Sequence, residues 1–278
     1  DSRTELVNEL TKENLKLLDF VSELNRFDVR GAAGTGKTAL ALEHAKRLKR
    51  QGKRVAFLCY SRALSAHIRH LVESWDKSER IDVVRTFHAL ARDWGVIVPP
   101  GVTDEFWETT ATLELIQKAY LSPDSEKFDA VIVDEAQDFG ANWWVAATEL
   151  LKDKSDGGLY AFGDLGQGIF NRSGTTDLGF VPLRLHKNLR NAEPIADAAN
   201  YLTATPALSA GLAGPEIRLV QVPEDADENA IIYAADDVVE YLRDDYGPQH
   251  VALLTTKGRH PVHRELANRD PDAYLKTL

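Results

Sequence analysis

What this chain of 278 residues lacks narrows its class before any motif is considered. With a single cysteine, Cys59, it can form neither an internal disulfide nor a cysteine-cluster metal site. No apolar run approaches the ~20 residues of a membrane-spanning helix, and the opening DSRTELVNEL lacks the charged flank and apolar core of a signal peptide. We therefore expect a cytoplasmic protein that has no membrane partner.

Methionine and an excess of positive charge are missing as well. The absence of methionine, the initiator included, suggests that the sequence is an excerpt of a longer chain. Lysine and arginine number 33 against 43 aspartates and glutamates, for a net charge of −10. This balance provides no general positive coat for nucleic acid, but it does not exclude a local basic groove.

What is present is the pattern of an α/β fold. Short runs rich in valine, isoleucine, phenylalanine and leucine alternate with longer amphipathic segments, which predicts a mostly parallel sheet flanked by helices. Strands are expected at 27–30, 55–60, 82–86, 129–133, 158–162, 217–222 and 250–255. Helices are expected at 11–25, 37–50, 61–74, 104–120, 141–152, 191–203 and 227–245, the first with Thr11 as its N-cap.

A glycine-rich segment between an expected strand and helix carries the strongest chemical signal. Residues 31–38, GAAGTGKT, fit the P-loop pattern G-x-x-x-x-G-K-[ST]. Backbone N–H groups can surround a polyphosphate there because the glycines leave no Cβ in the way. We expect Lys37 to reach the β- and γ-phosphates of ATP and the Thr38 hydroxyl to bind Mg²⁺. The cofactor-binding set is Gly31, Ala32, Ala33, Gly34, Thr35, Gly36, Lys37 and Thr38; the alternative is a glycine-rich turn without a ligand.

A second motif, FDAVIVDEAQDF at 128–139, ends an apolar strand in carboxylates. A strand of this kind would deliver Asp134 to the crevice beyond the strand ends, where the Mg²⁺ of a P-loop lies. Glu135 would polarise a water for attack on the γ-phosphorus, which favours hydrolysis over transfer to a substrate hydroxyl. The alternative is an ordinary solvated strand end.

With both motifs present, the chain resembles the UvrD/Rep-like helicases of superfamily 1, especially their compact bacterial branch. DEAQD is similar to the second motif of that family. Four further segments resemble its motifs Ia, Ib, III and IV in order: FLCYSRALSAHI, VRTFHALA, LYAFGDLGQGIF and RLHKNLRNAEPIADAAN. The resemblance covers essentially the whole chain.

The resemblance implies a RecA-like ATP-binding motor domain at 1–185, with a short accessory stub at about 92–127, and part of a second RecA-like domain at 186–278. It implies an ATP hydrolase, a Mg²⁺-dependent DNA helicase or translocase on single-stranded DNA. Gln167 would sense the γ-phosphate and Arg190 would be the arginine finger, beside catalytic Lys37 and Glu135. The DNA contacts would be Tyr60, Ser61, Thr86, Phe87 and His88, whose groups suit bases and phosphates.

The sequence departs from the family's pattern in places. Asn14 stands where the family has a glutamine that reads adenine, and Phe170, Asn171 and Arg172 stand where an aromatic stacking residue is common. No motif V or VI follows, so the chain is expected to end within the second domain. Such an excerpt should bind nucleotide weakly, hydrolyse it slowly and not unwind DNA.

Several assignments have plainer alternatives. Arg190 could pair with a surface acid, and Tyr60, Phe87 and His88 could be packing residues. Cations in the basic run His44–Arg54 are more simply stabilised by the end of the P-loop helix than by nucleic acid, and Trp143 with Trp144 suits helix packing.

The function has alternatives too. The main one is a nucleotide-binding regulatory or structural helicase-like module without processive motion, and a phosphotransferase with a small-molecule acceptor is a third. RNA could replace DNA as the track, because no residue identifiably reads a 2′-hydroxyl.

Overall fold

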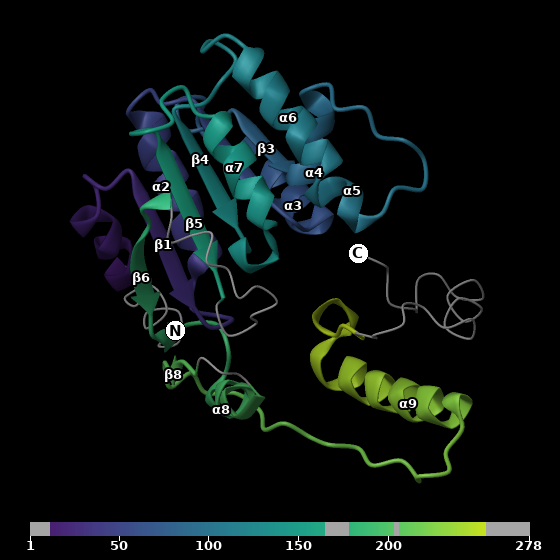
Figure 1. Cartoon of the computed structure of the whole chain (residues 1–278). Helices are drawn as coiled ribbons and strands as arrows, with labels where there is room; N and C mark the ends of the chain where they lie inside the picture. Colours follow the sequence, from purple (N-terminus) through teal and green to yellow (C-terminus); the bar gives the residue numbers. More distant parts are fainter. Residues whose placement is uncertain (1–11, 165–177, 203–205, 254–278) are drawn as a thin grey trace. The chain divides into compact units, whose positions relative to one another are not determined.

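The computed structural model describes residues 12–164, 178–202 and 206–253 (Figure 1). The chain divides into two compact units, 1–217 and 218–278. The predicted boundary between a first and a partial second RecA-like domain lies at 185/186, and the second RecA-like domain stays a prediction.

The first unit is built on one six-stranded sheet whose strands are all parallel. Its order is β3-β2-β4-β5-β1-β6. The strands are β1 (Arg26–Gly31), β2 (Val55–Cys59), β3 (Val83–Thr86), β4 (Ala130–Asp134), β5 (Gly158–Gly163) and β6 (Val181–Leu185). The predicted α/β class with a RecA-like P-loop sheet is confirmed. Because the strands run in one direction, their carboxyl ends share one edge, where ligands of such sheets bind.

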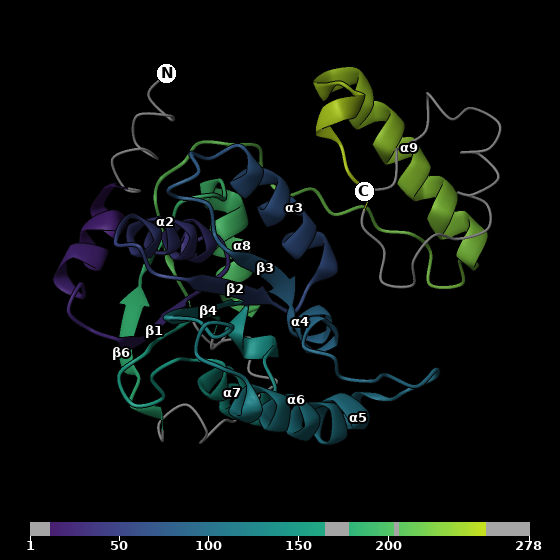
Figure 2. The same cartoon turned by 90° about the horizontal axis from the view of Figure 1, so that it is seen from above.

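Helices cover both faces of this sheet, as Figure 2 shows from above. One face packs against α2 (Lys37–Arg50), α3 (Arg62–Glu73) and a helix over 12–20. The other packs against α4 (Phe87–Asp93), α5 (Asp104–Glu108), α6 (Thr110–Leu121) and α7 (Ala141–Glu149). In β2, Val55 and Phe57 enter the first core while Ala56 and Leu58 enter the second. Successive side chains of a strand point to opposite faces of the sheet, and both faces are covered by helices. Nearly every strand residue is therefore buried, which explains why the strands appear in the sequence as continuous apolar runs.

Further elements complete the described chain. A 3₁₀ turn, η1 (Ala136–Asp138), follows β4, and a small parallel pair, β7 (Lys187–Asn188) with β8 (Leu208–Ser209), flanks α8 (Glu193–Leu202). In the second unit, α9 (Glu228–Tyr246) begins at Asp227, whose carboxylate accepts a hydrogen bond from the Ala230 N–H at 2.8 Å, and η4 (Pro248–His250) follows. None of the helices within the described ranges is both long and apolar enough to cross a membrane.

Most predicted elements of the first unit are confirmed with small shifts, and three predicted elements of the chain differ from the structure. The expected helix 104–120 is interrupted at Thr109, whose φ of −118° and ψ of −82° are not helical. The expected strand at 217–222 is coil with exposed apolar side chains, since its alternating pattern finds no partner strand among the described residues. Of the strand expected at 250–255, His250 ends η4, residues 251–253 are coil, and residues 254 and 255 lie outside the described residues. Thr11 lies outside them as well.

One histidine is part of the core beneath the sheet. His44 of α2 is buried, and its ring contacts Tyr160 and Phe27 edge to face at centroid distances of 4.2 and 5.0 Å. Its Nε2 atom is buried without a hydrogen-bond partner in the described structure. Burial, assisted by the nearby Arg47 cation, lowers the pKa of His44 to about 3.

This burial predicts a stability that falls with acid. The unfolded chain takes up the His44 proton near pH 6.5 and the folded chain only near pH 3, so stability present above pH 6.5 is lost as the pH falls. Between pH 7.5 and 5 the loss from this group should be about 2 kcal/mol. His44→Phe should flatten that dependence in urea unfolding at the two pH values. His70→Gln, at an exposed histidine of α3, is the control and should leave the dependence unchanged.

Candidate active site

The P-loop wraps back on itself between β1 and α2. Gly34 and Gly36 have φ values of +84° and +91°, in the left-handed region that favours glycine. The Thr35 hydroxyl donates to the Ala32 carbonyl at 2.9 Å, and the Lys37 ammonium donates to the carbonyls of Gly31 and Ala32 at 2.7 and 3.1 Å. The motif thus adopts a closed loop that ends at a helix N-terminus, the geometry that presents N–H groups to an anion.

A segment far along the sequence, 187–191, holds this loop. The Leu189 N–H donates to the Gly34 carbonyl at 2.8 Å, and the Asn188 amide donates to the Ala33 carbonyl at 3.1 Å. The Asn188 side-chain oxygen accepts from the N–H groups of Arg190 and Asn191 at 3.2 and 3.0 Å. A Cβ at Gly34 would lie 2.5 Å from that oxygen. Glycine is therefore required at position 34 by its backbone angle and by the approach of Asn188.

The predicted adenine reader also contacts the loop. The Asn14 amide nitrogen donates to the Thr35 carbonyl at 3.1 Å and would lie 3.6 Å from a Cβ placed on Gly36, as would the Leu189 Cδ1 atom. Asn14 lies beside the P-loop, as the sequence motif requires.

Asp134 ends β4 beside the start of α2. It is 1% exposed, and burial raises the pKa of its carboxyl group to about 6, while a hydrogen bond from the Thr38 side chain opposes the rise. Its Oδ1 accepts the Glu135 N–H at 3.0 Å, and its Oδ2 is buried without a further partner in the described structure. A buried carboxylate oxygen next to a threonine hydroxyl suits a hard cation, which supplies the missing partner.

Glu135 and two residues that the motif analysis did not single out form the next layer. Glu135 has a φ of +52°, an unusual backbone conformation for a residue with a side chain. The Gln137 amide donates to the Glu135 carboxylate at 2.6 Å, and its oxygen accepts the Asp164 N–H at 2.9 Å. Gln137 therefore joins the turn after β4 to the end of β5 and orients the Glu135 side chain.

Charges of four residues, from three segments of the chain, act on Lys37. Burial lowers its pKa, opposed by the carboxylates of Asp164, Glu135 and Asp134, and the Arg190 cation lowers it further. Arg190 is exposed and belongs to the segment 187–191 that holds the P-loop, so its charge lies near Lys37 within the first unit. The structure thus brings Lys37, Thr38, Asp134, Glu135 and Arg190 together at one sheet edge.

These residues fit a magnesium nucleotide. Thr38 and Asp134 could hold Mg²⁺, and the loop N–H groups and Lys37 could hold the phosphates. No group of three or more histidine, cysteine, aspartate or glutamate side chains forms a metal site in the described ranges. A cation here would need phosphate and water oxygens as well, as Mg²⁺ commonly has.

Four of the five expected DNA contacts are two aromatic rings at the surface and two hydroxyl groups that cap helices. Tyr60 is 45% exposed at the end of β2, and His88 is half-buried beside it, with ring centroids 5.8 Å apart. The hydroxyls of Ser61 and Thr86 cap α3 and α4 by accepting the N–H groups of Leu64 and Ala89.

Phe87 needs a correction. Its ring is fully buried and stacks on Trp143 at a centroid distance of 4.2 Å and an interplanar angle of 7°. A ring covered in this way cannot stack on a base, so its role is packing, the alternative considered from the sequence.

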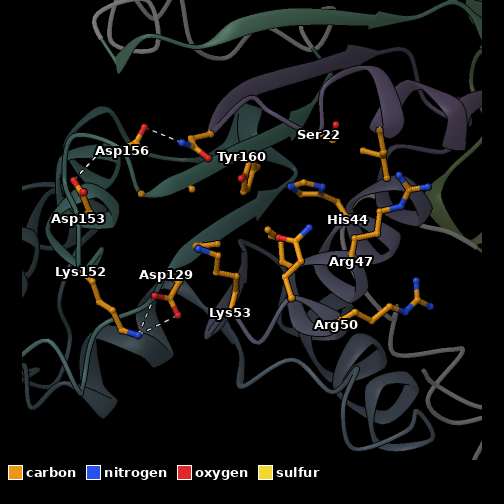
Figure 3. A pocket seen from close by; sticks show the side chains of 17 residues that line it. Ser22, His44, Arg47, Arg50, Lys53, Asp129, Lys152, Asp153, Asp156 and Tyr160 are labelled. Atoms are coloured by element: carbon orange, nitrogen blue, oxygen red, sulfur yellow. Dashed lines mark hydrogen bonds and ion pairs between the residues drawn. The ribbon is translucent and has the colours of Figure 1, made fainter.

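The basic run 44–54 is largely neutralised. Arg47, Lys49 and Arg50 pair with Asp19, Asp82 and Glu79 at 2.6 to 2.8 Å. A cavity of about 580 Å³ lies here, at the amino-terminal edge of the strands and thus opposite the P-loop. Figure 3 shows its side chains, including Lys152 paired with Asp129 at 3.0 Å. Mixed, paired charges give this cavity no net attraction for nucleic acid.

Four motif III residues, Gln167, Phe170, Asn171 and Arg172, lie outside the described residues. Sequence reasoning missed Asn188, Gln137 and Asp164. Asn188 stands in KNLRN, Gln137 in DEAQD and Asp164 in GDLGQ. Each is a polar residue at or just after the end of a strand to which the sequence analysis had given no role, and that position was the sign that could have identified it.

Residues 26–148 match the family model described as Schlafen group 3, DNA/RNA helicase domain. The matched stretch contains the P-loop and DEAQD and covers less than half of the chain. It indicates a helicase-like domain related to nucleic acid and does not single out the UvrD/Rep-like branch. No curated protein matches the sequence.

Asn188 provides a test of the contact that holds the loop. Asn188→Ala removes its hydrogen bonds to Ala33, Arg190 and Asn191 and should lower the free energy of unfolding by about 1–3 kcal/mol. Asn188→Asp keeps the acceptor for Arg190 and Asn191 but turns a buried carboxylate oxygen toward the Ala33 carbonyl, so it should be destabilising as well. Equal stability of wild type and Asn188→Ala in urea unfolding would show that the segment is not needed to hold the P-loop.

Proposed function

We propose that this chain is the core of an ATP-dependent DNA helicase or translocase of the UvrD/Rep-like kind, in which Mg²⁺-dependent ATP hydrolysis drives movement on single-stranded DNA. The observation that carries the proposal is the convergence of Lys37, Thr38, Asp134, Glu135 and Arg190 around the P-loop. The helicase-domain match over 26–148 supports the nucleic-acid part.

Each residue has a role that its position permits. The loop N–H groups and Lys37 bind the phosphates, and Thr38 with Asp134 holds Mg²⁺, which neutralises phosphate charge when bound. Glu135, oriented by Gln137, accepts a proton from the attacking water. Arg190 stabilises charge on the transferring phosphoryl group with fixed guanidinium donors. Asn14 contacts the adenine. Gln167, which lies outside the described residues, couples γ-phosphate binding to contact with the nucleic-acid strand.

The track follows the same carboxyl edge of the sheet. Tyr60 offers an exposed ring for a base, and the polar groups at Ser61 and His88 suit phosphate oxygens, while Thr86 is buried and caps α4. The resemblance favours single-stranded DNA, while the family match names both DNA and RNA. We place the protein in the cytoplasm.

Glu135→Gln tests the chemistry. The amide keeps the size of the side chain but cannot take the proton, so ATP binding should persist while turnover falls by about 10²–10⁴-fold. Nucleotide binding by equilibrium titration and phosphate release with and without single-stranded DNA are the measurements. Glu126→Gln, on an exposed carboxylate, is the control. Unchanged turnover in Glu135→Gln would remove the residue from its role.

Arg190→Ala tests the finger. Loss of the guanidinium should lower kcat by about 10³-fold or more with a smaller change in KM, because its charge acts mainly in the transition state. Arg184→Ala, an exposed arginine of β6, should have kcat close to wild type. If single-stranded DNA leaves the turnover of the intact protein unchanged while ATP still binds, the protein is a nucleotide-binding regulatory module rather than a motor.

A further inference from the structure

A second cavity, of about 370 Å³, lies at the carboxyl edge of the sheet beside β2, β3 and β4. We call it the aromatic pocket. Its rings are Tyr60, His88, Trp107 and Trp143, and its carboxylates are Asp104, Glu108 and Asp138. Its volume falls in the range of ligand pockets, ~300–1,000 Å³.

The rings form fixed walls. Trp107 and Trp143 are nearly buried, and the Trp143 indole N–H donates to the Trp107 carbonyl at 3.1 Å. The Tyr60 ring lies almost parallel to Trp143, at 19° and 6.3 Å between centroids, with one side open to solvent. His88 stands edge-on to Trp107 at 4.4 Å. The exposed Tyr60 ring supplies a face for a flat aromatic group, and the buried tryptophans form the rigid wall beside it.

Charged groups of both signs lie at or near the pocket. Asp104 begins α5, and Asp138 ends the η1 turn of DEAQD. Arg62 and Arg92 act electrostatically on His88, and the Arg92 guanidinium lies 4.9 Å from the centre of the Trp107 ring. Burial and these cations lower the pKa of His88 to about 4, so its ring is neutral at pH 7. The arginines oppose a cationic occupant and suit flanking phosphates.

We infer that the aromatic pocket receives an unstacked base of single-stranded nucleic acid and prefers a base with an exocyclic amino group, because its carboxylates accept hydrogen bonds from such a group. At position 4 of the ring, carboxylates accept from the cytosine amine and repel the carbonyl oxygen that uracil and thymine present there. Each carboxylate oxygen offers more than one lone pair, so acceptor capacity exists beside its contacts within the protein.

The inference rests on the proposed function and extends it to base preference. The pocket also lies close in the chain to Glu135, the proposed general base for ATP hydrolysis. The Asp138 N–H donates to the Glu135 carbonyl at 2.9 Å, so the pocket wall and the proposed general base are opposite ends of one turn. A base that contacts Asp138 therefore contacts the turn that holds Glu135.

The test compares oligo-dC with oligo-dU of equal length, which share backbone and ring size and differ at position 4, amine against carbonyl, and in the N3 proton that uracil alone carries. We expect the wild-type chain to bind oligo-dC roughly tenfold more tightly in fluorescence anisotropy at fixed salt. Asp104→Asn and, separately, Asp138→Asn should bring that ratio toward one. The ratio is the readout because removing a negative charge strengthens binding of both oligonucleotides.

The matched control is Glu105→Gln, which removes the same charge from the next residue of α5, outside the pocket, and should keep the wild-type ratio. Equal affinity of the wild type for the two oligonucleotides, or a ratio that survives both aspartate variants, overturns the inference while the proposed function stands. Binding of neither oligonucleotide overturns the nucleic-acid part of the proposed function as well. Tryptophan quenching by tetramethylammonium chloride beyond that by sodium chloride, with no base preference, would identify a cation cage instead.

Discussion

The parallel pairing of β1, β5 and β4 is the constraint on which the site depends. In this register Arg30 lies opposite Gly163 and Asp134 lies opposite Phe162, so the three strands end level with one another. The P-loop, the end of β5 and DEAQD are thereby presented at one edge without any loop having to span the sheet. Residues more than a hundred positions apart in sequence meet because parallel strands have one carboxyl edge.

The site is built at a cost to the apo protein. Asp134 is buried with an unpartnered oxygen among the described residues, and Glu135 holds a left-handed backbone angle. Isolated buried charge and strain of this kind are unfavourable unless a ligand compensates them. The second core, around α4 to α7, holds large aromatic side chains that stabilise the turn from below; Phe139 packs edge to face on Phe87 and Trp143. Packing of that core therefore supports the unfavourable geometry above it.

Much of the fold and part of the site could be predicted from sequence. Strands β1 to β5 and helix α2 read clearly because burial on both faces leaves apolar runs, and the P-loop and DEAQD are local patterns. The pairing of Asn188 with the loop could not be read, because it joins positions 155 residues apart through a single amide. The role of Phe87 could not be predicted either, because an aromatic residue that follows a strand gives the same sequence pattern whether its ring contacts a base or packs on Trp143. The break at Thr109 depends on how α5 and α6 pack against α7, which is tertiary information.

The contacts of Glu108 have a further consequence for the short accessory segment at about 92–127. A Cβ on Gly140, at the N-cap of α7, would lie 2.3 Å from the Glu108 carboxylate, and the Asn142 amide donates to the Glu108 carbonyl at 2.9 Å. The short segment before α6 is thus latched onto the helix that follows DEAQD. A larger insertion between residues 92 and 127 would be tolerated only if it left this latch in place, which marks Pro99 to Val102 rather than α5 as the point where relatives could differ in length.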